Sequence, residues 1–227
     1  MPAQREEGDR DERPMRVGVA GYGLSGEVFH CPLIEATPGM EVAVVVTSNE
    51  ERSSKAAARY PGAEVVPDIA DAWNGIDLLV VASPNRSHAE LALGAVERDL
   101  PVVIDKPLAA TLDEAKRVNR AGGRVTVFQN RRWDGDFMTL RSILDEGSLG
   151  QIVRFESRFE RFRQEIRDAW RESGDPLDGG GQLADLGAHL IDQAIVLFGP
   201  PNNVYAEVDT RRPGAVTDDD VFIALEH

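Results

Sequence analysis

Short apolar runs recur through the first part of the chain and are separated by more polar stretches of helical character. The runs typical of buried strands cover residues 15–20, 41–47, 77–82, 101–105 and 124–129. The stretches that predict helices cover residues 27–36, 53–59, 87–98 and 112–121. Strands that alternate with helices need crossover connections, which produce a parallel sheet with helices on both faces. The pattern therefore predicts an α/β fold with a doubly wound parallel sheet that has one strand for each apolar run.

The pattern changes after Arg132. Residues 134–146 are amphipathic with a helical period, and residues 151–164 alternate as an antiparallel strand with one wet face does. A helix over 182–197 and strands over 204–208 and 221–226 predict a partial α+β domain with a mainly antiparallel open sheet. The expected organisation is a charged, disordered tail over 1–14, a doubly wound domain over 15–130 and an incomplete second domain over 131–227.

The charge balance excludes several classes of partner. Asp and Glu outnumber Lys and Arg by 39 to 25, which gives a formal net charge of −14. Nucleic acids and anionic membrane surfaces both require a basic footprint, so neither is expected as a partner. The single cysteine, Cys31, cannot form an internal disulfide and is expected to pack rather than act as a nucleophile. A lone cysteine suits a reducing cytoplasm, which is the expected location, and no apolar run reaches membrane-spanning length.

The first apolar run leads directly into a G-x-G-x-x-G turn. Gly21 permits a tight turn, Gly23 lets the backbone approach a pyrophosphate, and Gly26 lets the following helix pack close to the strand. The N-terminus of that helix offers free N–H groups and the positive end of a dipole to phosphate. Because strand, turn and helix follow in the required order, the sequence predicts a dinucleotide site formed by Gly21, Tyr22, Gly23, Leu24, Ser25 and Gly26.

The end of the second strand bears on the choice between NAD and NADP. Dinucleotide folds selective for NAD place Asp or Glu there to bind the ribose 2′-hydroxyl. Here Thr47, Ser48 and Asn49 stand at that end, and Arg52 follows three positions later. Hydroxyls, an amide and an arginine suit a 2′-phosphate, so NADP is favoured. The alternative is that one of the two glutamates after Asn49 binds the ribose and the cofactor is NAD.

The carboxyl ends of parallel strands meet at one edge of a sheet, where ligands of such folds bind. Lys106 lies at such an end, and Pro107 favours an extended backbone that sends the lysine side chain off the strand. Lys106 is therefore expected to face a ligand rather than to be a surface lysine. The residues at these ends that are expected to contact the cofactor are Ser83, Pro84, Asn85, His88, Asp105, Lys106, Asn130 and Arg131.

A second group of candidates follows three consecutive glycines. Asp185, His189 and Asp192 are spaced four and three positions apart on one predicted helix, so one face can present all three. Imidazole titrates near neutral pH, and His189 can therefore take a hydroxyl proton and return it. A zinc site is not expected, because no second His or Cys lies nearby in the sequence. Ser25 has no base beside it in the sequence, which excludes a serine-hydrolase site.

Together these motifs resemble the glucose–fructose oxidoreductase / inositol dehydrogenase / rhizopine-catabolism family. The resemblance rests on the glycine turn followed by residues 29–34, on Pro84-Asn85 with His88, on Asp105-Lys106-Pro107, and on the glycines before Asp185 and His189. It implies an N-terminal NAD(P)-binding Rossmann domain and a C-terminal domain whose open sheet makes a homo-oligomer. It also implies that Lys106, Asp185 and His189 match the family's catalytic lysine, aspartate and histidine. Asp105 departs from the more frequent Glu-Lys-Pro.

The resulting hypothesis is an NAD(P)-dependent oxidoreductase that transfers a hydride between nicotinamide and a hydroxyl or carbonyl carbon of a sugar, polyol or related small molecule. His189 would take the hydroxyl proton, Lys106 would stabilise the developing alkoxide, and Asp185 would orient the substrate. Two alternatives stay open: a regulatory protein that binds NAD(P) without catalysis, and an inactive fragment of such an enzyme. The family's members continue beyond the position of His227, so cofactor binding with little turnover is expected of this chain.

Overall fold

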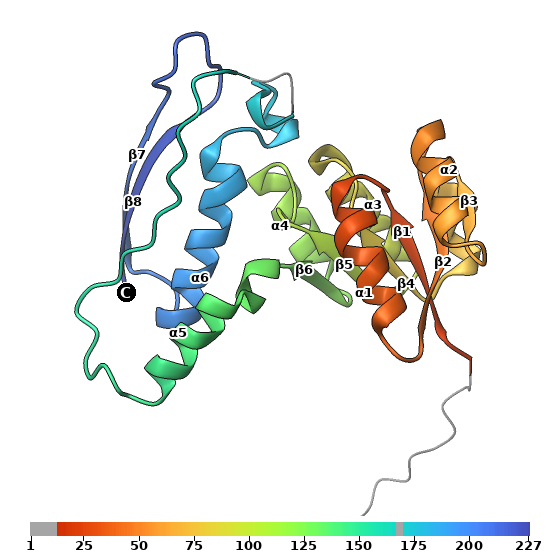
Figure 1. Ribbon diagram of the computed structural model, residues 1–227, viewed down its shortest axis with the longest axis horizontal. Coiled ribbons are helices and arrows are strands. Elements are labelled where there is room, and N and C mark those ends of the chain that lie inside the picture. Colours follow the sequence, from red (N-terminus) through yellow and green to blue (C-terminus); the bar gives the residue numbers. More distant parts are fainter. Residues whose placement is uncertain (1–12, 167–169) are drawn as a thin grey trace, which may run out of the picture. The chain divides into compact units, whose positions relative to one another are not determined.

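Figure 1 shows the computed structural model, which describes residues 13–166 and 170–227. The expectation of a disordered tail over 1–14 falls almost wholly outside the described residues. The chain divides into two units. The first runs to Ser83 and also includes Gly94–Val103 and Gly123–Val125, and the second comprises Pro84–Leu93, Ile104–Gly122 and Thr126–His227.

A six-stranded sheet has the order β3-β2-β1-β4-β5-β6. Its strands are β1 (Met15–Ala20), β2 (Met40–Val46), β3 (Glu64–Val66), β4 (Leu78–Val81), β5 (Val102–Asp105) and β6 (Val125–Phe128). β1 pairs in parallel with both β2 and β4, so the chain must cross over between these strands, as the alternating pattern predicts. The predicted α/β class with a doubly wound parallel sheet is confirmed.

Helices provide the crossovers. They are α1 (Cys31–Ala36), α2 (Glu50–Arg59), α3 (His88–Glu97) and α4 (Leu112–Ala121). α4 begins with a capping box in which Thr111 and Glu114 satisfy each other's backbone N–H groups. Short 3₁₀ turns lie at Ile69–Asp71, Trp73–Gly75, Asn85–Ser87, Asn130–Trp133, Trp170–Glu172 and Pro176–Asp178.

The sequence pattern missed β3. Its three residues are too few to show a period, and they follow a turn at Pro61 and Gly62. The strand is fixed instead by its pairing with β2, in which Val45 pairs with Val65 and Val46 with Val66. The prediction of one strand for each apolar run was therefore wrong by one strand.

The core of the first unit centres on β1 and β2. Val17, Val19 and Val45 are fully buried, and Tyr22 and Cys31 belong to the same apolar cluster. Burial, with a smaller contribution from the charge of Glu35, raises the pKa of the Cys31 thiol to about 12. Cys31 is thus a protonated core residue, as the sequence predicts, and not a thiolate nucleophile.

The second unit contains α5 (Gly135–Asp145), α6 (Ala188–Phe198) and a two-stranded antiparallel sheet of β7 (Asn203–Asp209) and β8 (Asp220–Glu226). The two strands pair along their whole length, from Asn203 with Glu226 to Asp209 with Asp220. A π-helical turn, Leu183–Gly187, leads directly into α6. Within residues 13–166 and 170–227, no helix has both the length and the apolar composition needed to cross a membrane.

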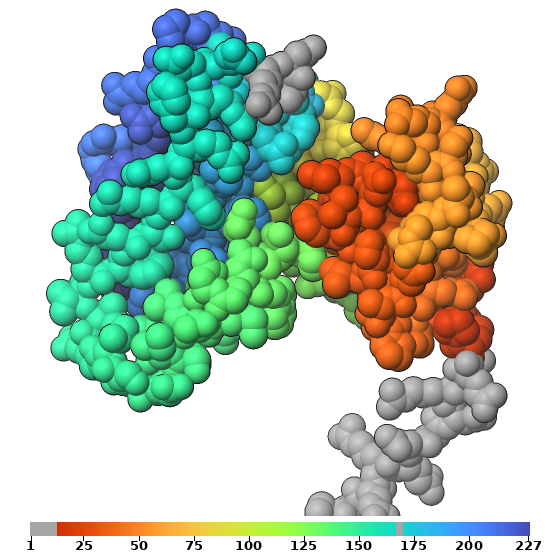
Figure 2. All heavy atoms as spheres, viewed as in Figure 1, coloured from red at the N-terminus to blue at the C-terminus, as the bar shows by residue number. Residues whose placement is uncertain are grey.

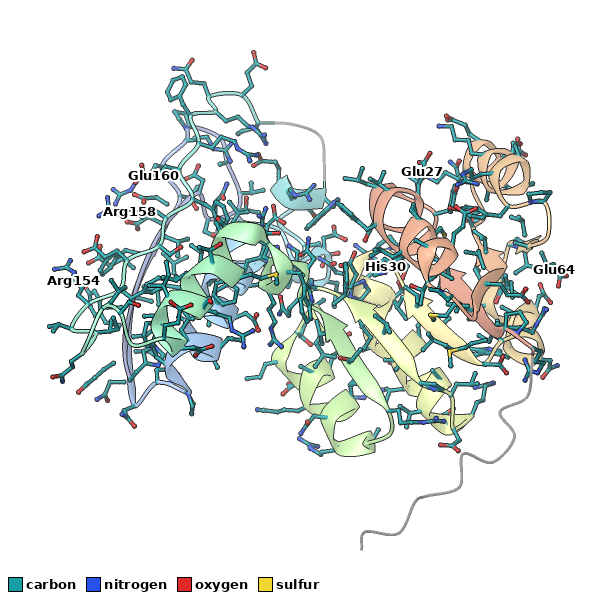
Figure 3. The ribbon with its side chains drawn as sticks, turned by 60° about the horizontal axis from the view of Figure 1, so that its bottom comes forward. Glu27, His30, Glu64, Arg154, Arg158 and Glu160 are labelled. Atoms are coloured by element: carbon teal, nitrogen blue, oxygen red, sulfur yellow. The ribbon has the colours of Figure 1, made fainter. Side chains whose placement is uncertain are left out.

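Residues 151–164 form no strand, contrary to the prediction. A strand needs a neighbour to pair with its backbone N–H and C=O groups, and the described antiparallel sheet consists of β7 and β8 alone. Alternation of side chains cannot supply that neighbour. The stretch lies at the surface in the space-filling view (Figure 2), and the side chains of Arg154, Arg158 and Glu160 point outwards from it (Figure 3).

Candidate functional site

The glycine turn of the first unit has no room for side chains at its last glycine. A Cβ added to Gly26 would lie 2.1 Å from the carbonyl oxygen of Gly21, a distance that no real contact tolerates. Behind the turn, the π-helical turn Gly26–His30 runs into α1. Glycine is therefore required at position 26, because any Cβ there would clash with the carbonyl oxygen of Gly21.

We expect Gly26→Ala to lower the stability of the first unit by about 2 kcal/mol or more, because backbone must move to admit the new Cβ. In thermal unfolding this corresponds to a fall in Tm of roughly 5 °C or more. Gly62→Ala is the matched control, because a Cβ at Gly62 meets nothing within 4 Å. Equal Tm values for the two variants would contradict the close approach at Gly26.

The predicted nucleotide residues beside this turn have different roles. The Asn49 side chain caps α2 by accepting a hydrogen bond from Arg52 N at 3.0 Å, and the Thr47 hydroxyl accepts one from Asn49 N at 3.4 Å. The Arg52 guanidinium extends to the glycine turn, where Nη1 lies 3.8 Å from the position of a Cβ on Gly23. Arg52 forms no ion pair within the described part of the chain. A cation without a carboxylate partner therefore stands beside the turn that the sequence assigns to phosphate.

The side chains between the glycines do not share one environment. Tyr22 is 2% exposed and packs edge-on against Tyr60, with 6.4 Å between ring centroids, so its side chain belongs to the core. Leu24 is 69% exposed. Of the residues predicted to bind the dinucleotide here, Tyr22 can thus offer only its backbone.

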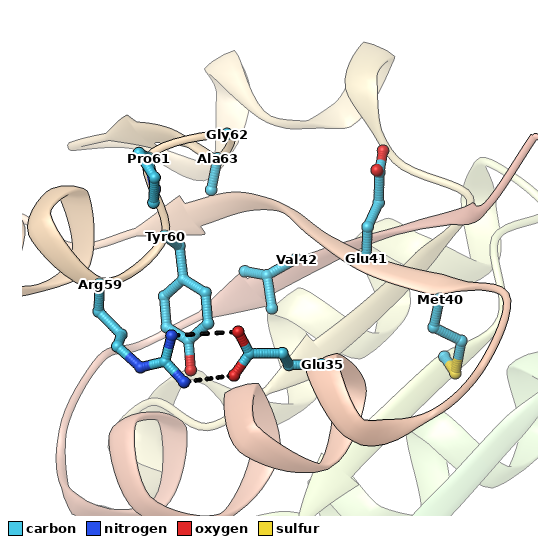
Figure 4. A pocket seen from close by; sticks show the side chains of 9 residues that line it. All are labelled: Glu35, Met40, Glu41, Val42, Arg59, Tyr60, Pro61, Gly62 and Ala63. Carbon is cyan, nitrogen blue, oxygen red and sulfur yellow. Dashed lines mark hydrogen bonds and ion pairs between the residues drawn. The ribbon is translucent and has the colours of Figure 1, made fainter.

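A hollow in the first unit lies elsewhere (Figure 4). Its lining comes from the amino end of β2, at Met40 and Glu41, whereas the glycine turn follows the carboxyl end of β1. Arg59 and Glu35 form a two-point ion pair across it, with Nη1 and Oε1 3.1 Å apart. The hollow contains none of the residues that the sequence predicts as functional.

In the second unit, Lys106 and Asp185 meet although 79 positions separate them. The Lys106 ammonium donates to the Asp185 carboxylate oxygen Oδ1 at 2.8 Å and to the Asp185 carbonyl oxygen at 2.7 Å. The second carboxylate oxygen, Oδ2, accepts from Arg171 Nε at 2.7 Å. Burial acts to raise the pKa of Asp185, but Lys106 and then Arg171 outweigh it, and the pKa is lowered. Asp185 is therefore a carboxylate held between two cations.

The backbone around Asp185 is fixed by the glycines before it. Gly181 has φ of +96°, and a Cβ there would lie 2.0 Å from Asp218 Oδ1. The Asp218 side chain occupies that space because its Oδ2 accepts from Leu183 N at 2.7 Å at the start of the π-helical turn. Gly181 thus lets Asp218 hold the first turn of the helical segment that carries Asp185 and His189.

His189 lies buried at the start of α6, with 6% of its surface exposed. Its ring nitrogen Nδ1 is fully buried and has no hydrogen-bond partner among the described residues. Burial first, and then the charges of Lys106 and Arg131, lower the pKa of His189 to about 4 against the opposing charges of Asp185 and Asp134. The imidazole is therefore neutral at neutral pH and can accept a proton.

Asp192 does not join this group. Its carboxylate forms a two-point ion pair with Arg132, with Nε–Oδ2 and Nη2–Oδ1 distances of 2.7 and 2.6 Å. The spacing argument placed Asp185, His189 and Asp192 together, and it could not anticipate a competing guanidinium from another segment. Asp192 therefore has a partner of its own in Arg132, and the expectation that one face presents all three side chains stays a prediction.

Several of the remaining predicted residues form hydrogen bonds within their own unit. In the second unit, Asn85 Nδ2 donates to Asp178 O at 2.6 Å, His88 Nδ1 lies 2.7 Å from Pro107 O, and Asp105 Oδ1 accepts from Lys106 N at 3.0 Å. Arg131, in the 3₁₀ turn that also contains Asn130, donates Nη1 to Asp134 at 3.0 Å. Ser83 ends the first stretch of the first unit and Pro84 begins the second unit.

The predicted residues are divided between the two units. Lys106, Asp185 and His189 belong to the second unit, while Gly21, Gly23, Gly26 and Arg52 belong to the first. Among the described residues, no group of three or more His, Cys, Asp or Glu side chains could hold a metal ion.

Two models of one protein family match the chain. The model described as an oxidoreductase family with an NAD-binding Rossmann fold matches residues 15–126, and that of the GFO/IDH/MocA C-terminal domain matches residues 137–227. The chain belongs to the GFO/IDH/MocA oxidoreductase family. The resemblance carried by the sequence motifs is thereby confirmed.

Several relatives in this family are curated proteins. The chain is 46% identical over 211 residues to the uncharacterized oxidoreductase YdgJ of Escherichia coli, in a match that covers 90% of the chain and 60% of the relative. It is 36% identical over 226 residues to scyllo-inositol 2-dehydrogenase (NADP(+)) IolW of Bacillus subtilis, covering 97% of the chain and 62% of the relative. The chain therefore spans about 60% of the length of these relatives.

Solved structures share this GFO/IDH/MocA fold. The oxidoreductase yvaA of Bacillus subtilis superposes with a TM-score of 0.88 at 36% identity, over 96% of this chain and 63% of that one. The oxidoreductase YPO2259 of Yersinia pestis superposes with a TM-score of 0.83 at 43% identity, over 95% of this chain and 61% of that one.

Sequence reasoning on this GFO/IDH/MocA chain missed Arg171. Its contact with Asp185 bridges 14 positions across an irregular stretch, so neither strand nor helix periodicity could reveal it. Once Lys106 occupies one oxygen of the Asp185 carboxylate, the other oxygen has room for a second cation, but nothing in the sequence indicates which residue supplies it.

Proposed function

We propose that this protein transfers a hydride between a nicotinamide cofactor, with preference for NADP, and a hydroxyl or carbonyl carbon of a sugar, polyol or related small molecule. The observation that carries the proposal is the grouping of Lys106 and Asp185 at 2.8 Å in the same unit as His189, whose buried Nδ1 has no hydrogen-bond partner among the described residues. An unpaired buried nitrogen is costly in a folded protein and is typical of a functional group that awaits a ligand. Membership of an oxidoreductase family supports the reaction class.

The proposed steps divide the work between three side chains. When bound, the nicotinamide supplies the hydride chemistry. His189 takes the proton from the substrate hydroxyl, which its neutral imidazole can do at neutral pH. Lys106 donates a hydrogen bond to the same oxygen and stabilises the charge that develops on it. Asp185 holds the Lys106 ammonium in place and orients the substrate.

The residues of the first unit fit a dinucleotide. Backbone fills the space beside Gly26 where a Cβ would stand, as a phosphate-binding turn requires, and Arg52 lies beside Gly23. The position of Arg52 supports NADP over NAD, and the relative IolW is named as an NADP(+) enzyme.

Fluorescence titration should find tighter binding of NADPH than of NADH. Arg52→Gln should weaken NADPH binding by about tenfold or more, because a charge-assisted hydrogen bond to phosphate contributes about 1.5–3 kcal/mol, and should change NADH binding little. Arg59→Gln is the matched control, an arginine of the same helix that pairs with Glu35 instead. An Arg52→Gln protein that binds both cofactors as the wild type does would remove Arg52 from 2′-phosphate recognition.

The reaction itself is tested by NADPH- and NADP-linked turnover across inositols, sugars and their keto forms. A substrate that turns over supports the proposal. Cofactor binding without turnover of any member would instead favour a protein that binds NAD(P) without catalysis.

The open β7–β8 sheet, which exposes Val204, Tyr205 and Phe222, is proposed as the surface through which copies associate.

A further inference from the structure

Arg171 is attached at both ends to the segment that carries Asp185. Its carbonyl oxygen accepts from Gly181 N at 2.9 Å, and the carbonyl oxygen of Gly181 accepts from Asp185 N at 3.1 Å. The Arg171 side chain then donates Nε to Asp185 Oδ2 at 2.7 Å. These three hydrogen bonds close a ring through the Arg171, Gly181 and Asp185 backbones, so the position of the carboxylate depends on Arg171.

The charges of this group do not cancel. Lys106 and Arg171 are both cations, and each takes one oxygen of the single carboxylate of Asp185. A lysine paired alone with an aspartate would form a neutral pair and could offer little charge to a third group. With Arg171 on the second oxygen, the three side chains together keep one positive charge, and the Lys106 end of the group is mostly enclosed, with 14% of that side chain exposed.

The Arg171 guanidinium also stacks on the aromatic side chain of Trp170. Its Cζ lies 4.3 Å from the centre of the Trp170 ring, a cation–π distance. The side chain is 48% exposed, whereas Asp185 is 18% exposed, so Arg171 reaches the carboxylate from the solvent side and Lys106 from the interior. Arg171 can therefore be replaced with less disturbance of the core than Lys106.

We propose that Arg171 is a positioning residue that fixes the Asp185 carboxylate and offsets its charge, so that the charge of Lys106 remains available to the reacting oxygen. The inference rests on the proposed function for the role of Lys106, and on geometry alone for the role of Arg171 towards Asp185. The charged and titratable groups that face this carboxylate are Lys106 at the end of β5, Arg171 from its 3₁₀ turn and His189 on α6, with Arg131 and Asp134 acting through His189.

The test is Arg171→Gln, with the Asp185 carboxyl carbon followed by ¹³C NMR through a pH titration. Loss of one cation should raise the apparent pKa of Asp185 above its wild-type value. Arg171→Lys keeps the charge and should return the pKa towards the wild-type value. Arg211→Gln is the matched control, since Arg211 donates Nε to Asp220 at 3.0 Å in the same unit and touches no residue of the site. A residue with a merely structural role would leave the pKa of Asp185 where it is.

Turnover provides the second arm. Arg171→Gln should lower kcat about tenfold or more and move the acid limb of the pH profile upwards, with Arg171→Lys partly rescuing both. An unchanged Asp185 pKa in folded Arg171→Gln protein overturns the inference, whatever the turnover does. Absence of turnover in the wild type together with a raised Asp185 pKa in the variant would refute the proposed function and keep the positioning role. If Arg171→Gln does not fold, the wild-type Arg171 Hε signal decides, because rapid exchange with water would show that its bond to Asp185 is not formed.

Discussion

Replacement of Lys106 by Met should lower kcat by about 10²-fold or more while reduced cofactor still binds. Its ammonium donates to the Asp185 carboxylate at 2.8 Å, and the only other lysine in the described second unit is the exposed Lys116. A single donor to a developing oxyanion is worth about 10²–10³ in kcat, and methionine fills a similar volume without donating. The effect should therefore fall on turnover rather than on the cofactor affinity.

Lys116→Met is the control for this experiment, because it removes the same charge from the surface of α4. Cofactor titration and thermal unfolding accompany the rate measurement, since Asp185 loses one of its two cations in Lys106→Met and some loss of Tm is expected. A Lys106→Met protein with turnover equal to that of Lys116→Met would exclude Lys106 from the reaction.

The strands and helices of the first part could be predicted because each carries its own signal. Val17, Val19 and Val45 are buried, and runs of such residues must be strands of a covered sheet. Thr111 and Glu114 likewise mark the start of α4 within the sequence itself. β3 has no such signal, since a partner strand rather than its own composition makes it a strand.

The sequence predicts on which element each residue of the candidate site lies, but not which of these side chains meet. Lys106 could be placed at a strand end and Asp185 with His189 on a helical segment, but their meeting depends on tertiary packing. Asp185 pairs with Arg171, and Asp192 pairs with Arg132. Both arginines lie in segments for which the sequence predicts neither a helix nor a strand. Ion pairs of this kind leave no periodic trace, so a sequence reveals the carboxylate and not its cation.

Replacement of His189 by Asn should lower kcat by about 10²–10⁴-fold, the usual contribution of a positioned acid–base group. Asparagine keeps a polar side chain of similar reach but cannot take a proton. His227→Asn is the control, an exposed histidine whose Nδ1 lies 2.8 Å from Gly199 O at the end of the same helix. Turnover of His189→Asn equal to that of the control would show that another group moves the hydroxyl proton.

The same variant should change how stability depends on pH. Unfolded His189 takes up a proton near its ordinary pKa of 6.5, whereas in the folded protein burial first, and then the charges of Lys106 and Arg131, lower this pKa to about 4. Between these two values the unfolded chain binds more protons, so acidification favours unfolding and stability rises with pH. At pH 5 the wild type should have lost about 2 kcal/mol of its unfolding free energy through this residue, relative to pH 7. Urea unfolding of His189→Asn at both pH values should lack that loss, while His227→Asn should retain it. An equal pH dependence in the two variants would mean that His189 titrates normally in the folded protein, and its neutral imidazole would then no longer support a role as the base.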